Sequence, residues 1–573
     1  MYVEDIKKDF YNVIIGKRIL LLVNYDIDAI CACKILQSLF RCDSIIYTLV
    51  PVQGITDLQK TYEDNCEDVK YVVLVNCGGT IDIVDALQPQ DDVVFFVVDS
   101  HRPTDVCNIY NNGQIRLLSK ADDDEGIPEF EEIFQEESDN EEEEEGSNAG
   151  SGEEDDIEES RQAKRRRLGE EAILKRRERR LWEEKRDRLM FDYTQFSYYG
   201  RSSAVLMFEL AWKLSKDNID LLWWAIVGVT EQVLLGKVEN QQYVLETGNL
   251  QGHVARLSYH GDIPDDENST QNKTALKITY DRDLQLALYR HWTVEASLRH
   301  SMYSAVKLKL WTLRGEKKLH ELLAEMGLPL VQSRQKFGAM DLVLRQEFHS
   351  MIAKLAEKYH LDDIVFASFT LQYGFRNRYC AADVVYAVLA TLESTGRDRT
   401  PADCFLDALD ALSRQRKDIL EAGIEKAKRM LTCIFKQVQA ALDMHQVISA
   451  GPFIYLVLQE GTLDAKMFSH PHCITLLAHF ALRAYVASSR NRKAPSLPLI
   501  ASAPHDLDKG TCLIVGIPPT CEDSPKNFFG KAFERAAEKT SARMLPDYFD
   551  SSIVQLKIED RTRFFDALTT LLS

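Results

Sequence analysis

The chain has 573 residues, a formal net charge of −20 and a hydrophobic fraction of 45%. This length exceeds what one hydrophobic core usually supports, so we expect about three domains. No apolar run approaches the roughly 20 residues that a membrane span needs, and the polar first residues predict no secretory signal peptide. The 12 cysteines are scattered through mostly apolar segments, which is typical of reduced thiols in a cytosolic or nuclear protein.

Apolar segments alternate with helix-like segments over the first 120 residues. Strands are predicted at Arg18–Asn24, Ser44–Val50, Val69–Val75, Val93–Val98 and Ile115–Leu118. Helices are predicted at Tyr2–Gly16, Ala29–Phe40, Gly54–Cys66 and Ile81–Leu87. Near-continuous apolar strands with helical crossovers predict an α/β fold with a parallel sheet covered on both faces.

Polar side chains of the types that bind cations follow three of these strands. Asp26 and Asp28 follow the first strand, Asn76 the third, and Asp99 and His101 the fourth. Ligand sites of open α/β sheets lie beyond the carboxyl ends of the strands, so these side chains should share one crevice. Carboxylate oxygens and imidazole suit a hard or borderline cation. The alternative interpretation is that each residue is only a turn former or helix cap.

The same positions resemble the motifs of the DHH phosphoesterase superfamily, the group of RecJ-type nucleases. Asp26 and Asp28 match its Asp-x-Asp motif, Asn76-Cys77-Gly78 stands for Asp-Cys-Gly, and Asp99-Ser100-His101 stands for Asp-His-His. A fourth motif, Gly-Thr-x-Ala-Asp, is weakly similar to Gly228-Val-Thr-Glu231. The resemblance implies a DHH-like parallel-sheet domain followed by a smaller C-terminal α/β domain, called DHHA1.

The departures from these motifs bear on activity. Asn76 is neutral where the family has a carboxylate, and Ser100 replaces a histidine. Two-metal phosphoester cleavage needs closely spaced ions held by bridging carboxylates, and fewer anionic ligands weaken cation binding. We therefore expect a vestigial site with no catalytic residue, no bound metal and no cofactor.

A narrower resemblance is to a catalytically silent, eukaryotic branch of this superfamily that acts in DNA replication. It rests on Asp26–Leu36, Asp99–Pro103, Met326–Leu330, Gly516–Pro519, Asn527–Phe533 and an acidic run. This resemblance implies a nuclear, non-catalytic subunit of the replicative helicase, required in the cell cycle for replication initiation and fork progression. The implied partners are the MCM helicase ring, the GINS complex and other replication-fork proteins, including DNA polymerases, with no membrane contact.

Two other functions remain open. An active metal-dependent exonuclease of the DHH type would use Asp26, Asp28, Asp99 and His101. A binder of single-stranded DNA would use the groove between the two α/β lobes, with Arg102 and Lys531 as possible phosphate contacts, although no aromatic stacking ladder is evident.

Charge is concentrated in two neighbouring segments. Residues 121–160 hold 21 acidic and no basic side chains, whereas residues 161–188 hold 13 basic and 6 acidic ones. The first segment cannot bury enough apolar surface to fold, so we expect a disordered acidic insertion at 121–162. The basic segment contains a possible nuclear import signal at Lys164, Arg165, Arg166 and Arg167, and it can also be a charged surface helix.

The DHH-like domain should resume at residues 163–260, with helices at Gly200–Trp212 and Leu221–Val229 that bring Glu231 toward the crevice. Residues 261–400 are predicted to form an inserted all-helical interaction domain, and residues 401–445 a helical connector. Residues 446–573 return to an α/β pattern. Strands are expected there at Val447–Leu458, Thr511–Ile517 and Ser551–Lys557, and helices at Phe528–Met544 and Asp560–Ser573.

Overall fold

A computed structural model describes residues 1–67, 69–120, 126–134, 176–261, 276–374, 377–395, 399–462, 464–521 and 526–573. These residues divide into two compact units, residues 1–121 with 196–573, and residues 122–195. The first unit contains an N-terminal lobe (1–121 and 196–261), a middle lobe (276–395) and a C-terminal lobe (446–573). One cluster of buried hydrophobic residues runs through all three lobes, and the division of the chain into about three domains stays a prediction.

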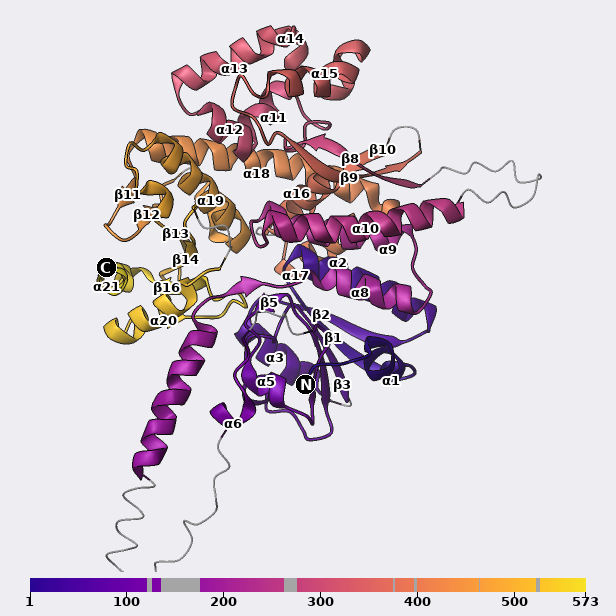
Figure 1. Ribbon diagram of the computed structural model, residues 1–573, viewed down its shortest axis with the longest axis vertical. Helices are drawn as coiled ribbons and strands as arrows, with labels where there is room; N and C mark the ends of the chain where they lie inside the picture. Colours follow the sequence, from indigo (N-terminus) through magenta and orange to yellow (C-terminus); the bar gives the residue numbers. More distant parts are fainter. Residues whose placement is uncertain are drawn as a thin grey trace, which may run out of the picture. The chain divides into compact units, whose positions relative to one another are not determined.

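The N-terminal lobe is built on a five-stranded sheet of order β2-β1-β3-β4-β6, and every pair in it is parallel (Figure 1). This confirms the predicted α/β fold. The second strand starts two residues later than expected. The strands are β1 (Arg18–Asn24), β2 (Ile46–Val52), β3 (Tyr71–Val75), β4 (Val94–Val98) and β6 (Ile115–Leu117).

Helices cover both faces of this sheet. On one face, α2 (Ile27–Cys42), α8 (Ser203–Lys213) and α9 (Ile219–Leu234) pack against one another, and α2 packs against β1 and β3. The other helices of the lobe are η1 (Ile6–Tyr11), α1 (Asn12–Ile14), α3 (Ile55–Asn65), α4 (Ile83–Leu87), α5 (Val106–Tyr110) and α10 (Asn240–Gly261). The rings of Phe96 and Phe10 meet on one face of β4, and the rings of Phe95 and Tyr62 meet on the other. Alternate residues of this buried strand therefore fill two separate layers.

The middle lobe is not all-helical as predicted, because it contains a three-stranded antiparallel sheet of order β10-β9-β8. Its strands are β8 (Lys277–Leu284), β9 (Val365–Tyr373) and β10 (Asn377–Cys380). The expected helical structure is overridden at Lys277–Leu284 because β8 pairs with β9, about 90 residues further along the chain. The helices of this lobe are α11 (Val294–His300), α12 (Met302–Leu308), α13 (Leu313–Glu325), α14 (Leu330–Ser333), η2 (Phe337–Ala339), α15 (Leu342–Leu355) and α16 (Ala381–Leu392).

Two helices connect the middle and C-terminal lobes, as expected for residues 401–445. They are α17 (Pro401–Ala411), with a complete capping box between Thr400 and Asp403, and α18 (Lys417–Asp443). The short η3 (Arg414–Arg416) joins them. Both helices pack on α16, so the connector is part of the core of the first unit.

The C-terminal lobe has a mixed six-stranded sheet of order β11-β12-β13-β14-β16-β15. Its strands are β11 (Val447–Ser449), β12 (Ile454–Val457), β13 (Leu499–Asp506), β14 (Thr511–Ile517), β15 (Met544–Leu545) and β16 (Ile553–Lys557). Its helices are η4 (Ala465–Ser469), α19 (Pro471–Ser488), η5 (Ala494–Ser496), α20 (Phe529–Thr540), η6 (Ile558–Asp560) and α21 (Arg561–Leu572). The sequence predicted β11, β12, β14, β16, α20 and α21, but it missed β13, β15, α19 and the three short η helices. A second cluster of buried apolar residues, including Phe529 and Phe564, lies between this sheet and α20 and α21.

The second unit contains two described helices, α6 (Phe130–Ile133) and a helix at residues 176–194. α6 falls within the insertion that was expected to be disordered, so that prediction is wrong for residues 126–134. The basic helix belongs to this unit and not to the N-terminal lobe. The remaining predictions for the acidic insertion, the linker after Gly261 and Lys164 to Arg167 lie outside the described residues. Among the helices that are described, none is long and apolar enough to cross a membrane.

Candidate functional site

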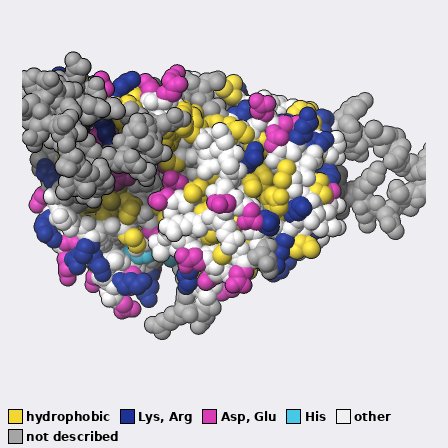
Figure 2. Space-filling view, turned by 90° about the horizontal axis from the view of Figure 1, so that it is seen from below, with side chains coloured by type: hydrophobic (Ala, Val, Ile, Leu, Met, Phe, Trp, Pro, Cys, Tyr) yellow, Lys and Arg dark blue, Asp and Glu magenta, His cyan; other side chains and the backbone are white. Residues whose placement is uncertain are grey.

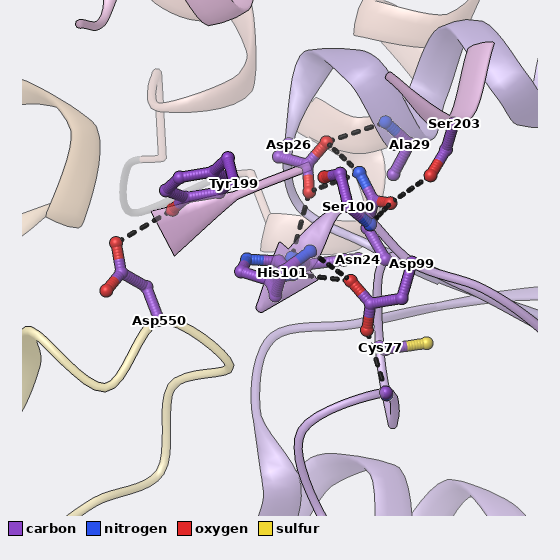
Figure 3. Close-up of polar contacts among 12 residues, drawn as sticks. Asn24, Asp26, Ala29, Cys77, Asp99, Ser100, His101, Tyr199, Ser203 and Asp550 are labelled. Carbon is purple, nitrogen blue, oxygen red and sulfur yellow. Dashed lines mark hydrogen bonds and ion pairs between the residues drawn. The ribbon is translucent and has the colours of Figure 1, made fainter. Parts of the chain in front are cut away.

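The predicted crevice residues do converge at the carboxyl ends of β1, β3 and β4. Asp26, Asp99, Ser100 and His101 turn toward one another in Figure 3, and Ser203 approaches from the start of α8. The whole predicted set is buried, and it comprises Asp26, Asp28, Asn76, Asp99, His101 and Glu231. The sequence therefore predicted correctly which polar side chains meet at this edge of the sheet.

The side chain of Asn76 lies between two carboxylates. Its Nδ2 group donates to Asp26 Oδ1 at 3.1 Å, to Asp26 Oδ2 at 3.2 Å and to Asp28 Oδ2 at 3.2 Å. Its Oδ1 accepts from the backbone N–H of Ser100 at 3.1 Å and from the hydroxyl of Ser203. Because a backbone N–H can only donate, this contact fixes which end of the amide faces the carboxylates. The amide hydrogens of Asn76 thus provide positive partial charge between Asp26 and Asp28.

The backbone at Asn76 explains why this residue type is tolerated there. Asn76 has a φ of 50°, in the left-handed region that asparagine adopts more readily than most residues. Its backbone N–H donates to the carbonyl of Val98 at 2.8 Å, which continues the pairing of β3 with β4. The side chain therefore leaves the sheet edge in a direction that reaches both carboxylates.

Asp28 is held by the N-terminus of α8. Its carboxylate accepts from the backbone N–H groups of Ser203 (2.8 Å) and Ala204 (3.0 Å) and from the hydroxyl of Ser202. Free N–H groups at a helix start favour an anion. Burial and the nearby Asp26 charge nevertheless raise the pKa of Asp28. A Cβ at Gly228 would lie 2.7 Å from Asp28 Oδ1, so only glycine lets α9 approach so closely.

The carboxylates of Asp26 and Asp99 also accept hydrogen bonds from donors within the protein. Asp26 caps α2 by accepting from the Ala29 N–H at 2.6 Å, and it accepts from Asn24 Nδ2 at 3.0 Å. Asp99 accepts from the Gly79 N–H at 2.9 Å and pairs with His101 Nδ1 at 2.6 Å. Burial alone would raise the pKa of Asp99, but the charge and hydrogen bond of His101 outweigh it and lower that pKa.

Glu231 forms an ion pair that the sequence did not reveal. Its side chain is fully buried, and Glu231 Oε1 lies 2.7 Å from Lys237 Nζ. Burial raises the pKa of Glu231 above its usual value, although Lys237 opposes this shift. The Lys237 ammonium lies 4.7 Å from the ring centre of Tyr199, whose hydroxyl donates to Asp550 of the C-terminal lobe at 2.8 Å (Figure 3). The site thus extends from the crevice at the carboxyl ends of β1, β3 and β4 to the C-terminal lobe.

The two predicted phosphate contacts have different environments. Arg102 is only 2% exposed, and its guanidinium donates to the carbonyl oxygens of Asp99 and His101, each at 2.9 Å. Lys531 is partly exposed in the first turn of α20 and pairs with Glu534 at 2.7 Å. Arg102 therefore stabilises the turn after β4, and a role of either residue in binding DNA stays a prediction.

Comparison with known proteins decides the family. The CDC45 family model matches residues 19–571. This chain belongs to the CDC45 family. The cell division control protein 45 homolog of Homo sapiens is 45% identical over the full length of both chains, and the homolog of Schizosaccharomyces pombe is 31% identical, covering 97% of this chain and 96% of that one. This membership confirms the narrower resemblance to the replication branch.

A solved structure of the family has the same fold. The crystal structure of CDC45 from Entamoeba histolytica matches with a TM-score of 0.70 at 22% identity and covers both chains completely. The crystal structure of exonuclease RecJ bound to manganese matches at a TM-score of 0.41 and 12% identity, covering 97% of this chain and 90% of that one. The match to the Entamoeba histolytica structure therefore shows that the two chains share a fold.

The DHH superfamily implies a divalent metal site, and the residues of this CDC45 family member do not fit one. The Asn76 amide hydrogens point at the two carboxylates that would face a cation, and the Glu231 oxygen that faces Lys237 is already paired. Across the described ranges, no group of three or more His, Cys, Asp or Glu side chains is arranged to hold a metal ion.

The N-terminal and C-terminal lobes enclose a cavity of about 360 Å³ beside the crevice. Its lining includes Asp26, His101 and Lys237 from the first lobe, and four further histidines, which are His470, His472, His479 and His505. Burial lowers the pKa of His470 to about 4 and of His479 to about 3. Both rings are thus neutral near pH 7.

Proposed function

We propose that this chain is a non-catalytic structural subunit of the eukaryotic replicative helicase, acting in the nucleus with the MCM ring and the GINS complex. In this role it is required for DNA replication initiation and fork progression, and it also meets other fork proteins, including DNA polymerases. The observation that carries the proposal is the Asn76 amide, which donates to both Asp26 and Asp28 in a member of the CDC45 family.

The chemistry of the crevice supports a non-catalytic role. Hydrolysis of a phosphoester by the two-metal route needs one ion to activate the water and another to stabilise the leaving oxygen. The carboxylate oxygens of Asp26, Asp28 and Asp99 already accept hydrogen bonds. The donors are backbone N–H groups, hydroxyls, Asn76 and His101. Rearranging them around ions would break several buried hydrogen bonds, each of which is expensive to leave unmade.

The middle lobe supports a role in binding partners. Large apolar side chains are exposed at the starts of α13, α14 and α15, and α14 is tied to the start of α15 by the Asp341 N–H, which donates to Gln332. We call this set the middle-lobe apolar residues, and it comprises Leu313, Leu330, Val331, Leu342 and Val343. Exposed apolar groups of this kind often mark a protein interface.

A nuclease assay tests the non-catalytic role. The purified chain, incubated with single-stranded DNA and Mg²⁺ or Mn²⁺, should release no nucleotides above the level of an Asp26→Ala variant. Degradation by the unmodified protein that disappears in Asp26→Ala would overturn the proposal in favour of an active DHH-type exonuclease.

A reconstitution assay tests the partner role. Val331→Glu combined with Val343→Glu should weaken association with a purified complex of MCM and GINS by tenfold or more, because both side chains are more than half exposed and apolar. Leu545→Glu is the matched control, since Leu545 is an exposed apolar residue of the C-terminal lobe. Unchanged association of a folded double variant would exclude this surface as the interface.

Contact with single-stranded DNA is the second candidate, favoured by the cavity beside Lys237 and the histidines. Its volume matches that of a small-ligand pocket, which gives room for one nucleotide of such a strand. Binding of labelled single-stranded DNA at several salt concentrations tests it. A phosphate contact at Lys531 predicts that Lys531→Ala reduces the slope of log affinity against log salt by roughly 0.7. An unchanged slope removes Lys531 from the contact surface.

A further inference from the structure

The mismatch between the implied metal site and the residues present points to a specific replacement. We propose that Lys237 is a built-in counter-cation, which takes over the charge-balancing role of a divalent ion for the buried carboxylates and makes the site independent of metal. Asn76 assists it by donating hydrogen bonds where a negative ligand would otherwise stand.

The position of Lys237 follows from how α9 ends. The helix closes with Gly236 N–H donating to Val233 and Lys237 N–H donating to the carbonyl of Gln232 at 2.8 Å. Gly236 has a φ of 69°, the left-handed conformation that favours glycine after a helix. This turn brings Lys237 back over the last turn of α9, where Glu231 lies, and so places the ammonium inside the lobe.

The electrostatics of this position are those of a cation site. The Lys237 side chain is 13% exposed, and its Nζ contacts Glu231 Oε1 and the face of Tyr199. Burial alone would lower the pKa of Lys237, but Glu231 and then Asp26, with a further contribution from Asp28, raise it above its usual value. A single ammonium is therefore attracted by three acidic residues of the crevice, as a bound metal ion would be.

The second carboxylate oxygen of Glu231 does not take part in the ion pair with Lys237. Glu231 Oε2 is buried and has no hydrogen-bond partner in the structure. An unpaired buried carboxylate oxygen is costly unless a positive charge lies close by. The ammonium of Lys237 supplies that charge. Removing Lys237 should therefore leave a cluster of acidic side chains that binds another cation.

Binding of Mn²⁺ tests the inference directly. Four proteins are compared by titration with Mn²⁺ and electron paramagnetic resonance of the free ion: the unmodified chain, Asn76→Asp, Lys237→Met and the double variant. The unmodified chain should show no saturable binding at millimolar Mn²⁺, and Asn76→Asp little. The double variant should bind at least tenfold more tightly than Asn76→Asp. Lys216→Met is the matched control, because Lys216 also pairs with a carboxylate, Asp43, and lies 5.6 Å from a tyrosine ring centre, but far from the crevice in the fold.

Each outcome of these experiments either supports or contradicts the role of Lys237 as a counter-cation. Saturable Mn²⁺ binding by the unmodified chain that is lost in Asp26→Ala would overturn the proposal. So would a folded double variant that binds no more tightly than Asn76→Asp, or a gain of affinity in Lys216→Met. If Lys237→Met fails to fold, refolding is repeated with Mn²⁺ or Mg²⁺. Rescue by the divalent ion but not by an equal ionic strength of KCl supports the counter-cation role, and failure of rescue contradicts it.

Discussion

The hydroxyl of Tyr199 donates a 2.8 Å hydrogen bond to Asp550 Oδ2, which joins two residues 351 positions apart and ties the N-terminal lobe to the C-terminal lobe. Two further contacts do the same. Ser197 and Asn527 exchange backbone hydrogen bonds of 2.7 and 2.8 Å, and Asp547 caps α3 through the N–H groups of Ile55 and Thr56, both at 2.7 Å. Gly54 allows this approach, because a Cβ there would lie 2.4 Å from the carbonyl oxygen of Asp547. The residues that make these contacts between the lobes, among them Tyr199, Asn527 and Asp550, also line the cavity.

The Tyr199 contact should contribute measurably to stability. Tyr199→Phe keeps the ring beside Lys237 and His101 but removes the hydroxyl, so we expect a loss of about 1.5–3 kcal/mol in the free energy of unfolding, as for other hydrogen bonds to charged groups. Urea unfolding of Tyr199→Phe, Asp550→Asn and the double variant forms a cycle. Non-additivity of about 1 kcal/mol or more confirms the coupling, whereas additive losses would mean that the two side chains act independently.

Restoring the family carboxylate should damage the protein. Asn76→Asp replaces the Nδ2 donor that serves Asp26 and Asp28 with a third negative charge in a buried site. An uncompensated buried charge typically costs about 3–5 kcal/mol, and we expect a loss of this size in the free energy of unfolding. Asn240→Asp, at the exposed start of α10, is the control and should cost less than about 1 kcal/mol. Equal losses in the two variants would show that Asn76 does not neutralise the crevice.

Local patterns predicted the N-terminal lobe well, because its central strands β1, β3 and β4 are largely buried and so appear as continuous apolar runs. The strand at Arg18–Asn24 was predicted to the residue. The middle-lobe sheet was missed although β9 alternates apolar Ala367, Phe369, Leu371 and Tyr373 with polar Ser368, Thr370 and Gln372, because β9 pairs with β8 only across a long sequence separation. The same limit explains the missed β13, which lies between β12 and β14 in the sheet.

Some features of the candidate site could likewise be predicted from the sequence, and others could not. The strand-end residues and the loss of charge at Asn76 could be predicted, since motif spacing alone indicates them. The direction of the Asn76 amide could not be predicted, because it depends on the Ser100 N–H and the Ser203 hydroxyl, which arrive from other parts of the chain. Gly236-Lys237 after a predicted helix was the available signal for a helix-ending turn, but nothing in its spacing indicated that Lys237 would reach Glu231.

The pair formed by Asp99 and His101 should make stability depend on pH near neutrality. Burial alone would lower the pKa of His101, but Asp99 raises it above 6.5 overall, while the pKa of Asp99 is lowered. The stabilisation from His101 is full below pH 6.5 and is lost as pH rises through its raised pKa. That from Asp99 is full above pH 3.8 and is lost on further acidification. His101→Gln should therefore cost more stability at pH 5.5 than at pH 9, measured by urea unfolding. A cost that does not change with pH would contradict the charged pair.

The cavity histidines should respond to acid in the opposite way. The pKa of His479 falls to about 3 because the ring is buried and Arg483 lies nearby. A histidine whose pKa is lowered in the folded state stabilises the protein above the unfolded value of about 6.5, and this contribution is lost as pH falls below it. The loss is at most about 1.4 kcal/mol for each pH unit, since one proton is taken up on unfolding. His479→Gln should flatten the fall in stability between pH 6.5 and pH 4, whereas His445→Gln, at an exposed position after α18, should leave the pH profile unchanged. An identical acid profile in His479→Gln and the unmodified chain would show that this ring is hydrated and free to protonate in the folded protein.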